Sequence, residues 1–261
     1  MPLKLPKIIG HRGCAGYAPE NTLEAIHTAA DMGIEWVELD VKLTKDEIPI
    51  IFHDDMLDRT TNGAGNVADK TLEEIKELDC GNWYGESFTG IQIPTLEQAI
   101  DVLLERNLGL NLEIKPCAGR EKDTAEVALD LLSSIWDEHD KLYISSYSMV
   151  SLESAADMAG DWSRGIVMGQ RSKEDWLAAL KNNKTPEDWL TISKYLELEA
   201  ISIDQEFCSE QLIRKILEQN ITPIPYNVND ARRAIDLQHL GIKSFISDYP
   251  DEINDSLFSV H

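Results

Sequence analysis

Cysteine and basic residues are scarce in this sequence, and each shortage excludes a class of protein. Four cysteines occur among 261 residues, and no two form a Cys-x-x-Cys pair, so the chain carries neither a zinc-ribbon nor a redox motif. We expect Cys14, Cys80, Cys117 and Cys208 to be the reduced thiols of a cytosolic protein. Lysine and arginine total 24 against 47 aspartates and glutamates, and the net charge of −23 argues against binding nucleic acid or an anionic membrane.

Long hydrophobic runs are missing as well. No uncharged stretch exceeds about 11 residues, against the roughly 18 that a membrane-spanning helix needs. The first ten residues include two lysines and two prolines, where a signal peptide would have an apolar core. We therefore expect a cytoplasmic protein without stable membrane association. At roughly 150 residues per domain, the length fits one large α/β barrel or two small domains.

Short apolar runs alternate with amphipathic stretches along the chain. Eight runs read as strands: Lys7–Gly10, Trp36–Val41, Leu110–Ile114, Leu142–Ser146, Gly165–Met168, Ala200–Asp204, Thr222–Tyr226 and Lys243–Ile246. Helical patterns lie between them: Thr22–Met32, Thr95–Asn107, Thr124–His139, Ser148–Ala159, Ser209–Gln219 and Asn229–Leu240. This alternation is typical of a parallel α/β sheet, and eight units predict a (β/α)8 TIM barrel that occupies residues 1–261 as a single domain.

A ninth apolar run, Ile48–His53, follows the second strand too closely for a parallel crossover, which needs a dozen or more residues. We predict the return arm of a hairpin whose turn is centred on Asp46. In that hairpin Leu43 would face Ile48, and Glu38 would face His53, so the histidine would return to the barrel's mouth.

Two stretches interrupt the regular alternation. Residues 54–94 are rich in glycine, threonine and asparagine, with one helical pattern at Thr71–Leu78, and we predict an inserted subdomain on the mouth. The stretch Gln170–Glu199 contains Glu-Asp-Trp-Leu at 174–177 and again at 187–190, each after a residue suited to cap a helix. These repeats predict two helices.

Three carboxylates should meet at the mouth. Side chains alternate along a strand, so Glu38 and Asp40 share one face of the second strand, and Glu113 shares a face with Lys115 on the third. All four lie near the carboxyl ends of their strands, where barrel active sites are built. Surface salt bridges with neighbouring lysines are the alternative, but convergence on one mouth favours a site for Mg²⁺ or Ca²⁺, which prefer oxygen ligands.

Basic and titratable side chains surround the same mouth. His11-Arg12-Gly13 follows the first strand, where a guanidinium can bind phosphate through two oxygens. His53 ends the hairpin arm, so the two histidines could act as acid and base on one substrate. The other four histidines lie in helical or terminal contexts and receive no role, and Asn62-Gly63-Ala64-Gly65 is a turn rather than a nucleotide-binding fingerprint.

Several ordered motifs resemble those of the glycerophosphodiester phosphodiesterase family. Those near the mouth are His11-Arg12-Gly13, Pro19-Glu20-Asn21-Thr22, Glu38-Leu39-Asp40-Val41, His53-Asp54, Glu113-Ile114-Lys115 and Ser247-Asp248-Tyr249-Pro250. Those within the insertion are Asp58-Arg59-Thr60-Thr61-Asn62-Gly63, Leu78-Asp79-Cys80-Gly81-Asn82-Trp83 and Ile93-Pro94-Thr95-Leu96. The chain departs from the family at Tyr226-Asn227-Val228-Asn229, where the family usually has Trp-Thr-Val-Asn.

The resemblance implies a cytosolic, bacterial-type enzyme with the barrel of the phospholipase C-like phosphodiesterases. It implies metal-dependent hydrolysis of a small glycerophosphodiester to an alcohol and sn-glycerol 3-phosphate, through a cyclic phosphate. A divalent metal would bind Glu38, Asp40 and Glu113. By the same resemblance, His11 and His53 match the general acid/base pair, while Arg12 and Lys115 match phosphate-binding positions. For Glu20 and Asn21, a capping or outer-shell role is as plausible as direct contact with substrate.

Two alternative functions remain open from the sequence. One is a barrel that binds a phospho-ligand without catalysis, against which the intact set of histidines and carboxylates argues. The other is a lysophospholipase D-type enzyme, for which Trp83, Tyr84 and Phe88 could form an apolar lip. We expect these aromatics to form the small core of the insertion instead. The oligomeric state and the preferred head group do not follow from the sequence.

Overall fold

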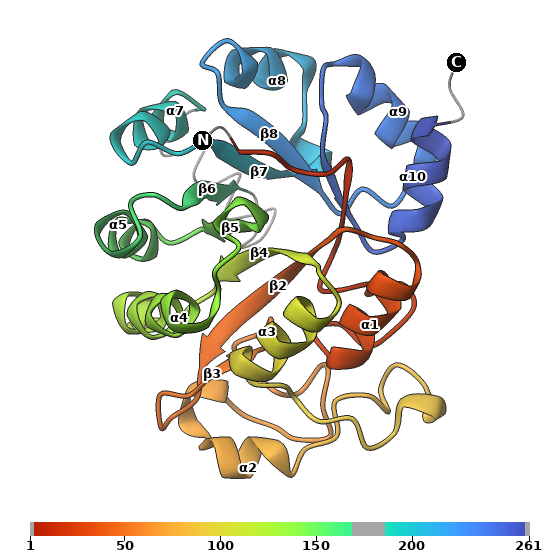
Figure 1. The fold of residues 1–261 in the computed structure, drawn as a ribbon, viewed down its shortest axis with the longest axis vertical. Coiled ribbons are helices and arrows are strands. Elements are labelled where there is room, and N and C mark those ends of the chain that lie inside the picture. The colour runs from red at the N-terminus through yellow and green to blue at the C-terminus, as the bar shows by residue number, and fades with distance from the viewer. Residues whose placement is uncertain (1–2, 169–185, 259–261) are drawn as a thin grey trace.

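A ring of parallel strands forms the centre of the protein (Figure 1). The computed structural model describes residues 3–168 and 186–258. The eight strands are β1 (Ile8–Gly10), β2 (Trp36–Leu43), β4 (Gly109–Ile114), β5 (Leu142–Ser146), β6 (Ser163–Met168), β7 (Ala200–Asp204), β8 (Thr222–Tyr226) and β9 (Phe245–Ser247). Their order is β8-β7-β6-β5-β4-β2-β1-β9. The Val228 N–H donates to the Ile246 carbonyl at 3.1 Å and brings β8 beside β9, so the predicted barrel is confirmed.

Helices surround the ring (Figure 1). They are α1 (Leu23–Asp31), α3 (Leu96–Glu105), α4 (Glu121–Ile135), α5 (Met149–Met158), α7 (Pro186–Tyr195), α8 (Glu210–Leu217), α9 (Ala231–His239) and α10 (Pro250–Phe258). Hydroxyl caps begin several of them: Thr22, for example, accepts the Ala25 N–H, and Thr95 forms a capping box with Gln98. None of the helices in the described residues is long and apolar enough to cross a membrane.

The helix predictions differ from the structure in detail. The second Glu-Asp-Trp-Leu lies in α7, as predicted, whereas the first, at 174–177, falls outside the described residues. Helix α4 begins three residues before the predicted Thr124 and ends at Ile135. Helix α10, which packs beside α9 and β1, was not predicted.

Apolar side chains fill both sides of the strand ring. The larger cluster lies between strands and helices and includes Leu39, Leu112 and Ile144. A smaller cluster, including Trp36, Tyr143 and Ile224, fills the inside of the barrel, and Leu3 and Leu5 from the N-terminal segment pack against it. Apolar side chains fill the inside of the barrel, so a polar site can form only at the ends of the strands. In barrels of this kind it forms at the carboxyl ends.

The predicted hairpin is present, but its register is shifted by one residue. Strand β3 (Pro49–Ile51) pairs antiparallel with β2, and Leu43 faces Pro49 rather than Ile48. The turn is indeed centred on Asp46: the Thr44 N–H donates to the Ile48 carbonyl at 3.0 Å, and Glu47 adopts a left-handed φ of 63°. A three-residue loop that ends in a left-handed residue sets Leu43 opposite Pro49. The expected pairing of Glu38 with His53 is therefore also wrong by one position.

The chain between β3 and α3 packs over β3 (Figure 1). It carries α2 (Leu72–Lys76), which lies within the predicted helical stretch Thr71–Leu78 and is capped by Thr71. Its core is mostly aliphatic: Ile50, Phe52, Leu57, Val67, Ile75, Cys80, Ile93 and Cys117. The expectation that Trp83, Tyr84 and Phe88 form this core is wrong. Their rings contact edge to face outside it, and Trp83 is 41% exposed. The Cys80 N–H donates to the Ile91 carbonyl and closes the loop that carries the three rings, which separates them from the core.

Candidate active site

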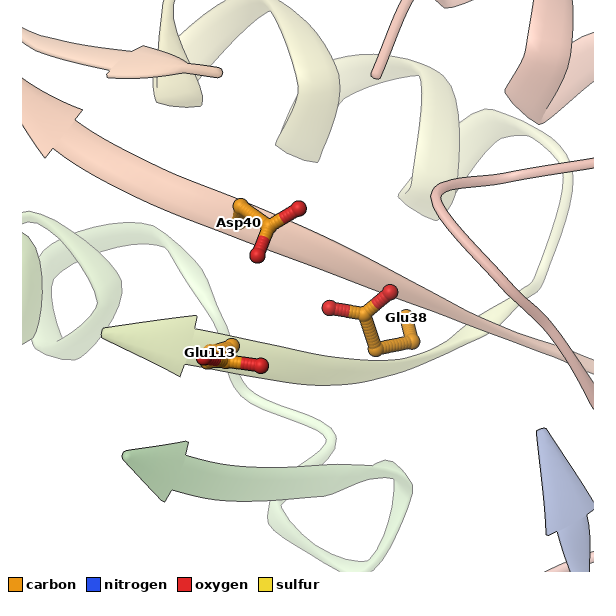
Figure 2. A group of neighbouring side chains, drawn as sticks. All are labelled: Glu38, Asp40 and Glu113. Carbon is orange, nitrogen blue, oxygen red and sulfur yellow. The ribbon is translucent and has the colours of Figure 1, made fainter. Parts of the chain in front are cut away.

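Three carboxylates meet at the mouth of the barrel (Figure 2). Glu38 and Asp40 alternate along β2, and Asp40 lies directly opposite Glu113 of β4 in the parallel ladder. One oxygen of each carboxylate lies within 4.8 Å of the others, and all three side chains are buried. The sequence-predicted metal ligands are therefore brought together by strand alternation and strand pairing.

The electrostatics of this triad fit a bound cation. Burial, together with repulsion from Asp40 and Glu113, raises the pKa of Glu38 well above its usual range. Burial also acts to raise the pKa of Asp40, but attraction to His53 and Lys115 outweighs it, and the net shift is downward. Three buried carboxylates that repel one another could be stabilised by a divalent metal, and their oxygen atoms are the ligands that Mg²⁺ and Ca²⁺ prefer.

His11 lies where β1 ends, beside the triad. Its Nδ1 is 2.6 Å from Asp248 Oδ1, and its Nε2 is 3.8 Å from Glu38 Oε2. Asp248 follows β9 and is itself held by Asn229, whose amide donates to Oδ2 at 2.6 Å. An aspartate on Nδ1 fixes the orientation of the ring and leaves Nε2 facing the carboxylates.

His53 shows the same arrangement from the other side. Its Nδ1 is 2.5 Å from Asp54 Oδ1, and its Nε2 is buried without a hydrogen-bond partner among the described residues. Burial lowers the pKa of His53, although the charge of Asp40 and the hydrogen bond to Asp54 oppose the shift. Both candidate acid/base histidines thus have one ring nitrogen fixed and the other available at the mouth.

A tight turn after β1 places Arg12 over the carboxylates. Arg12 has a left-handed φ of 50°, and its backbone N–H donates to Glu38 Oε2 at 3.0 Å. The next residue, Gly13, has a φ of 87°, and a Cβ there would lie 2.7 Å from the Ala25 side chain. The guanidinium contacts Glu20 at 2.6 Å and faces Asp40 at 3.7 Å. Only glycine suits this turn, which explains His-Arg-Gly.

Lysines complete the positive side of the mouth. Lys115 Nζ lies 3.4 Å from Glu113 and 3.6 Å from Asp40. Lys42, the next inward residue of β2, is buried and donates to Asp55 and to the Lys115 carbonyl. Both lysines line a cavity of about 350 Å³ together with His53, Asp54, Asp55, Met56 and Tyr147. The space beside His53 is large enough for a small polar group.

Comparisons with known proteins agree with this geometry. The profile of the glycerophosphoryl diester phosphodiesterase family matches residues 11–252. A phosphodiesterase of Oleispira antarctica, solved with the product sn-glycerol-3-phosphate, is 36% identical, has a TM-score of 0.88, and each chain covers 98% of the other. A glycerophosphodiester phosphodiesterase of Caldanaerobacter subterraneus is 37% identical over 67% of this chain and 71% of its own length.

The chain belongs to the glycerophosphoryl diester phosphodiesterase family. The predicted enzyme class, a phosphoric diester hydrolase, is thereby confirmed. A Bacillus subtilis glycerophosphodiester phosphodiesterase adds a further relative, 28% identical over 93% of this chain and 83% of that protein. Neither alternative, a lysophospholipase D or a non-catalytic barrel, is supported by these relatives.

The phosphodiesterase site includes residues to which the sequence analysis gave no role. Asp248 and Asp54 hold the two histidines, and Arg59 contacts Asp54 and Glu20. Glu20 and Asn21 act from outside the triad: Glu20 binds Arg12, and the Asn21 amide donates to Asp40 at 2.8 Å. Asp248, Asp54 and Arg59 all lie within the family motifs, and this position in the motifs could have indicated that they belong to the site.

The departure from the family at 226–229 lies inside and beside the barrel. Tyr226 is buried, and its hydroxyl donates to the Met168 carbonyl at 2.9 Å across the interior. Asn227 has a left-handed φ of 58°, and its amide donates to Asp204 at 3.0 Å. Asn229 holds Asp248, so the family's Asn at this position supports His11.

Proposed function

We propose that this chain hydrolyses small glycerophosphodiesters to an alcohol and sn-glycerol 3-phosphate with the help of Mg²⁺ or Ca²⁺. The observation that carries the proposal is the meeting of two aspartate-held histidines with one buried carboxylate triad. Glu38, Asp40 and Glu113 would hold the metal. When bound, the metal supplies positive charge that stabilises negative charge on the phosphoryl oxygens.

Arg12 and Lys115 are proposed to bind the phosphate. Their cationic groups face the triad from β1 and β4, so a phosphate beside the carboxylates lies between them. Arginine suits this role because its fork can donate to two phosphate oxygens. Lysine contributes a compact positive charge.

The two histidines are proposed to move protons in two steps. In the first step, the glycerol hydroxyl next to the phosphate ester attacks phosphorus, one histidine takes its proton, and the other protonates the departing alcohol. Water then opens the cyclic phosphate, and the histidines exchange roles to restore their starting states. A nucleophile already within the substrate has a large effective concentration, which favours this route over direct attack by water.

The remaining proposals concern the surroundings of the site. Residues 54–94 are proposed to act as one subdomain beside the mouth, within a single-domain barrel, because they supply Asp54 and Arg59.

A cytoplasmic location is proposed from the four cysteines, which are free and buried. Burial raises the pKa of Cys14, Cys80 and Cys208 to about 12. The net charge of −23 supports a small-molecule substrate rather than nucleic acid or a stable membrane contact.

A matched pair of substrates tests the proposed chemistry. One diester carries the hydroxyl next to the phosphate ester, and its partner has the same leaving alcohol but a hydrogen in place of that hydroxyl. We expect kcat to fall by several orders of magnitude for the second diester, on the scale of a lost intramolecular nucleophile. A cyclic glycerol phosphate should be detected transiently by ³¹P NMR. Equal kcat for the two diesters would instead assign the attack to water.

A further inference from the structure

Arg59 joins two carboxylates that come from different loops of the mouth. Its Nη1 and Nη2 donate to the two oxygens of Glu20, both at 2.7 Å. Its Nε and Nη2 donate to Asp54 at 2.6 and 3.0 Å. Glu20 precedes α1, whereas Asp54 and Arg59 follow β3. One guanidinium therefore binds both the loop after β1 and the start of residues 54–94.

Each of these carboxylates also contacts a residue of the proposed machinery. Glu20 Oε1 accepts from Arg12 Nη1 at 2.6 Å, and Asp54 Oδ1 lies 2.5 Å from His53 Nδ1. The contacts form a continuous chain, Arg12–Glu20–Arg59–Asp54–His53, which we call the arginine bridge. It connects the group proposed to bind phosphate with a group proposed to move a proton.

We propose that Arg59 is a positioning residue that holds Arg12 and His53 in register with each other through Glu20 and Asp54. The proposal rests on the proposed function, because that function assigns roles to Arg12 and His53. Arg59 is not itself a catalytic residue: all three of its nitrogens donate to the two carboxylates.

The chemistry of the guanidinium explains why arginine suits this place. A planar fork can serve two carboxylates in fixed directions, whereas an ammonium group offers a point charge without that geometry. Glu20 and Asp54 would also repel each other without a cation between them. The hydrogen bonds to Glu20 and Asp54 raise the pKa of Arg59, despite its partial burial. Burial would raise the pKa of Asp54, but its hydrogen bonds to His53 and Arg59 lower it.

Burial differs along the bridge in a way that makes a test practical. The Arg59 side chain is 45% exposed, whereas that of Glu20 is 10% exposed. We therefore expect Arg59→Ala to fold, and its effect on function can be separated from its effect on stability.

The first experiment compares Arg59→Ala, Arg59→Lys and the native chain on a glycerophosphodiester at saturating metal. We expect kcat to fall about 10- to 100-fold in Arg59→Ala, the range seen when an outer partner of a functional group is removed. Arg59→Lys should recover only part of the loss, because the fork is missing. Arg214→Ala is the matched control, since Arg214 is an exposed arginine paired with Glu210 on α8, and it should leave kcat and KM unchanged.

Chemical rescue and a double-mutant cycle distinguish positioning from general support. Millimolar guanidinium should restore part of kcat in Arg59→Ala and have no such effect in Arg214→Ala. In an Asp54→Asn background, Arg59→Ala should cost less than it does alone, because both substitutions break the same bridge. Native-like kcat and KM in Arg59→Ala would overturn the proposal, as would losses that multiply independently in the double variant.

A spectroscopic measurement separates this inference from the proposed function. The Nδ1–H proton resonance of His53, identified by its loss in His53→Ala, should shift or broaden in Arg59→Ala and stay unchanged in Arg214→Ala. If the native chain turned over no glycerophosphodiester, the proposed function would fail, and this resonance would still report on the bridge. An unchanged resonance together with native turnover in Arg59→Ala would overturn the positioning role alone.

Discussion

The two histidines of the mouth each place Nδ1 against an aspartate, and the Nε2 of each makes no hydrogen bond to the carboxylate triad. This holds although they come from different parts of the chain, one after β1 and one after β3. Nδ1 is used in both cases, so Nε2 is the nitrogen available for proton transfer. The chemistry of each histidine therefore depends on a neighbour as much as on the imidazole itself.

Substituting either histidine should reduce turnover without abolishing substrate binding. We expect His11→Ala and His53→Ala each to lower kcat by about 10²–10⁴-fold with a much smaller change in KM, the usual contribution of general acid–base catalysis. Steady-state kinetics measure the split. His27→Ala is the control, because His27 lies on α1 and contacts Arg106. A folded His27 variant that lost as much kcat would show that the histidines were wrongly chosen.

Removing the metal or one of its proposed ligands should stop the reaction. We expect chelation, Glu38→Gln and Glu113→Gln each to lower kcat by at least about 10³-fold, since a metal supplies several kcal/mol of charge stabilisation. Mg²⁺ or Ca²⁺ should restore the chelated enzyme but not the variants. Thermal unfolding should show that both variants fold, because glutamine has nearly the same shape as glutamate and can still form hydrogen bonds. Normal turnover in a metal-free preparation would contradict the role of the triad.

At the scale of elements, close packing between strands places the site. Trp36 begins β2, and its indole lies over Gly109, which begins β4. A Cβ on Gly109 would lie 2.2 Å from the ring, closer than real side chains approach. Glycine is required here because the indole occupies the space, and the same pairing of β2 with β4 sets Asp40 opposite Glu113.

Adding a methyl group at this contact should destabilise the barrel. We expect Gly109→Ala to lower the free energy of unfolding by about 1–3 kcal/mol, the usual cost of overpacking. Urea denaturation measures the change. Gly160→Ala is the control, because a Cβ there meets nothing closer than the Ala156 carbonyl oxygen at 3.4 Å. Equal stability of the two variants would mean that Trp36 moves aside at little cost.

Across the whole molecule, contacts of carboxylates with histidine and arginine side chains join loops that are distant in sequence. Asp248 pairs with His11 across 237 positions, and Glu20 pairs with Arg59 across 39. Burial acts to raise the pKa values of Asp248 and Glu20, but hydrogen bonds to His11 and to Arg59 lower them. The folded state therefore favours the charged forms of these carboxylates.

These shifts predict a loss of stability in acid. Each pKa is lower in the folded chain than in the unfolded one, where it is about 3.9 for Asp and 4.3 for Glu. The stabilisation is therefore complete above about pH 4 to 5 and is lost as pH falls through the folded values. We expect the free energy of unfolding to fall below pH 4, and to fall less steeply in Asp248→Asn than in the native chain. Urea denaturation between pH 2.5 and 6 measures both slopes.

The exposed Asp161 provides the control for that comparison. Asp161→Asn should keep the native dependence on pH. If Asp248→Asn and the native chain lost stability in parallel, the contact of Asp248 with His11 would make no contribution to acid sensitivity.

The barrel and the carboxylate triad were predictable from the sequence, because both follow from short-range rules. Alternating strands and helices predict parallel strands, and the period of two along β2 places Glu38 and Asp40 on one face. Parallel pairing then adds Glu113. These predictions require no contact between side chains that are distant in sequence, so they do not depend on the paths of the loops.

The residues that hold those groups in place became visible only in the folded chain. The Asp248–His11 contact and the arginine bridge join loops whose paths no periodicity describes. The hairpin register depended on one left-handed residue, Glu47, and a one-residue slip moves every side chain of a strand to the other face. The exposure of Trp83 depended on where a loop closes. Such contacts are set by the packing of distant segments, which local sequence does not encode.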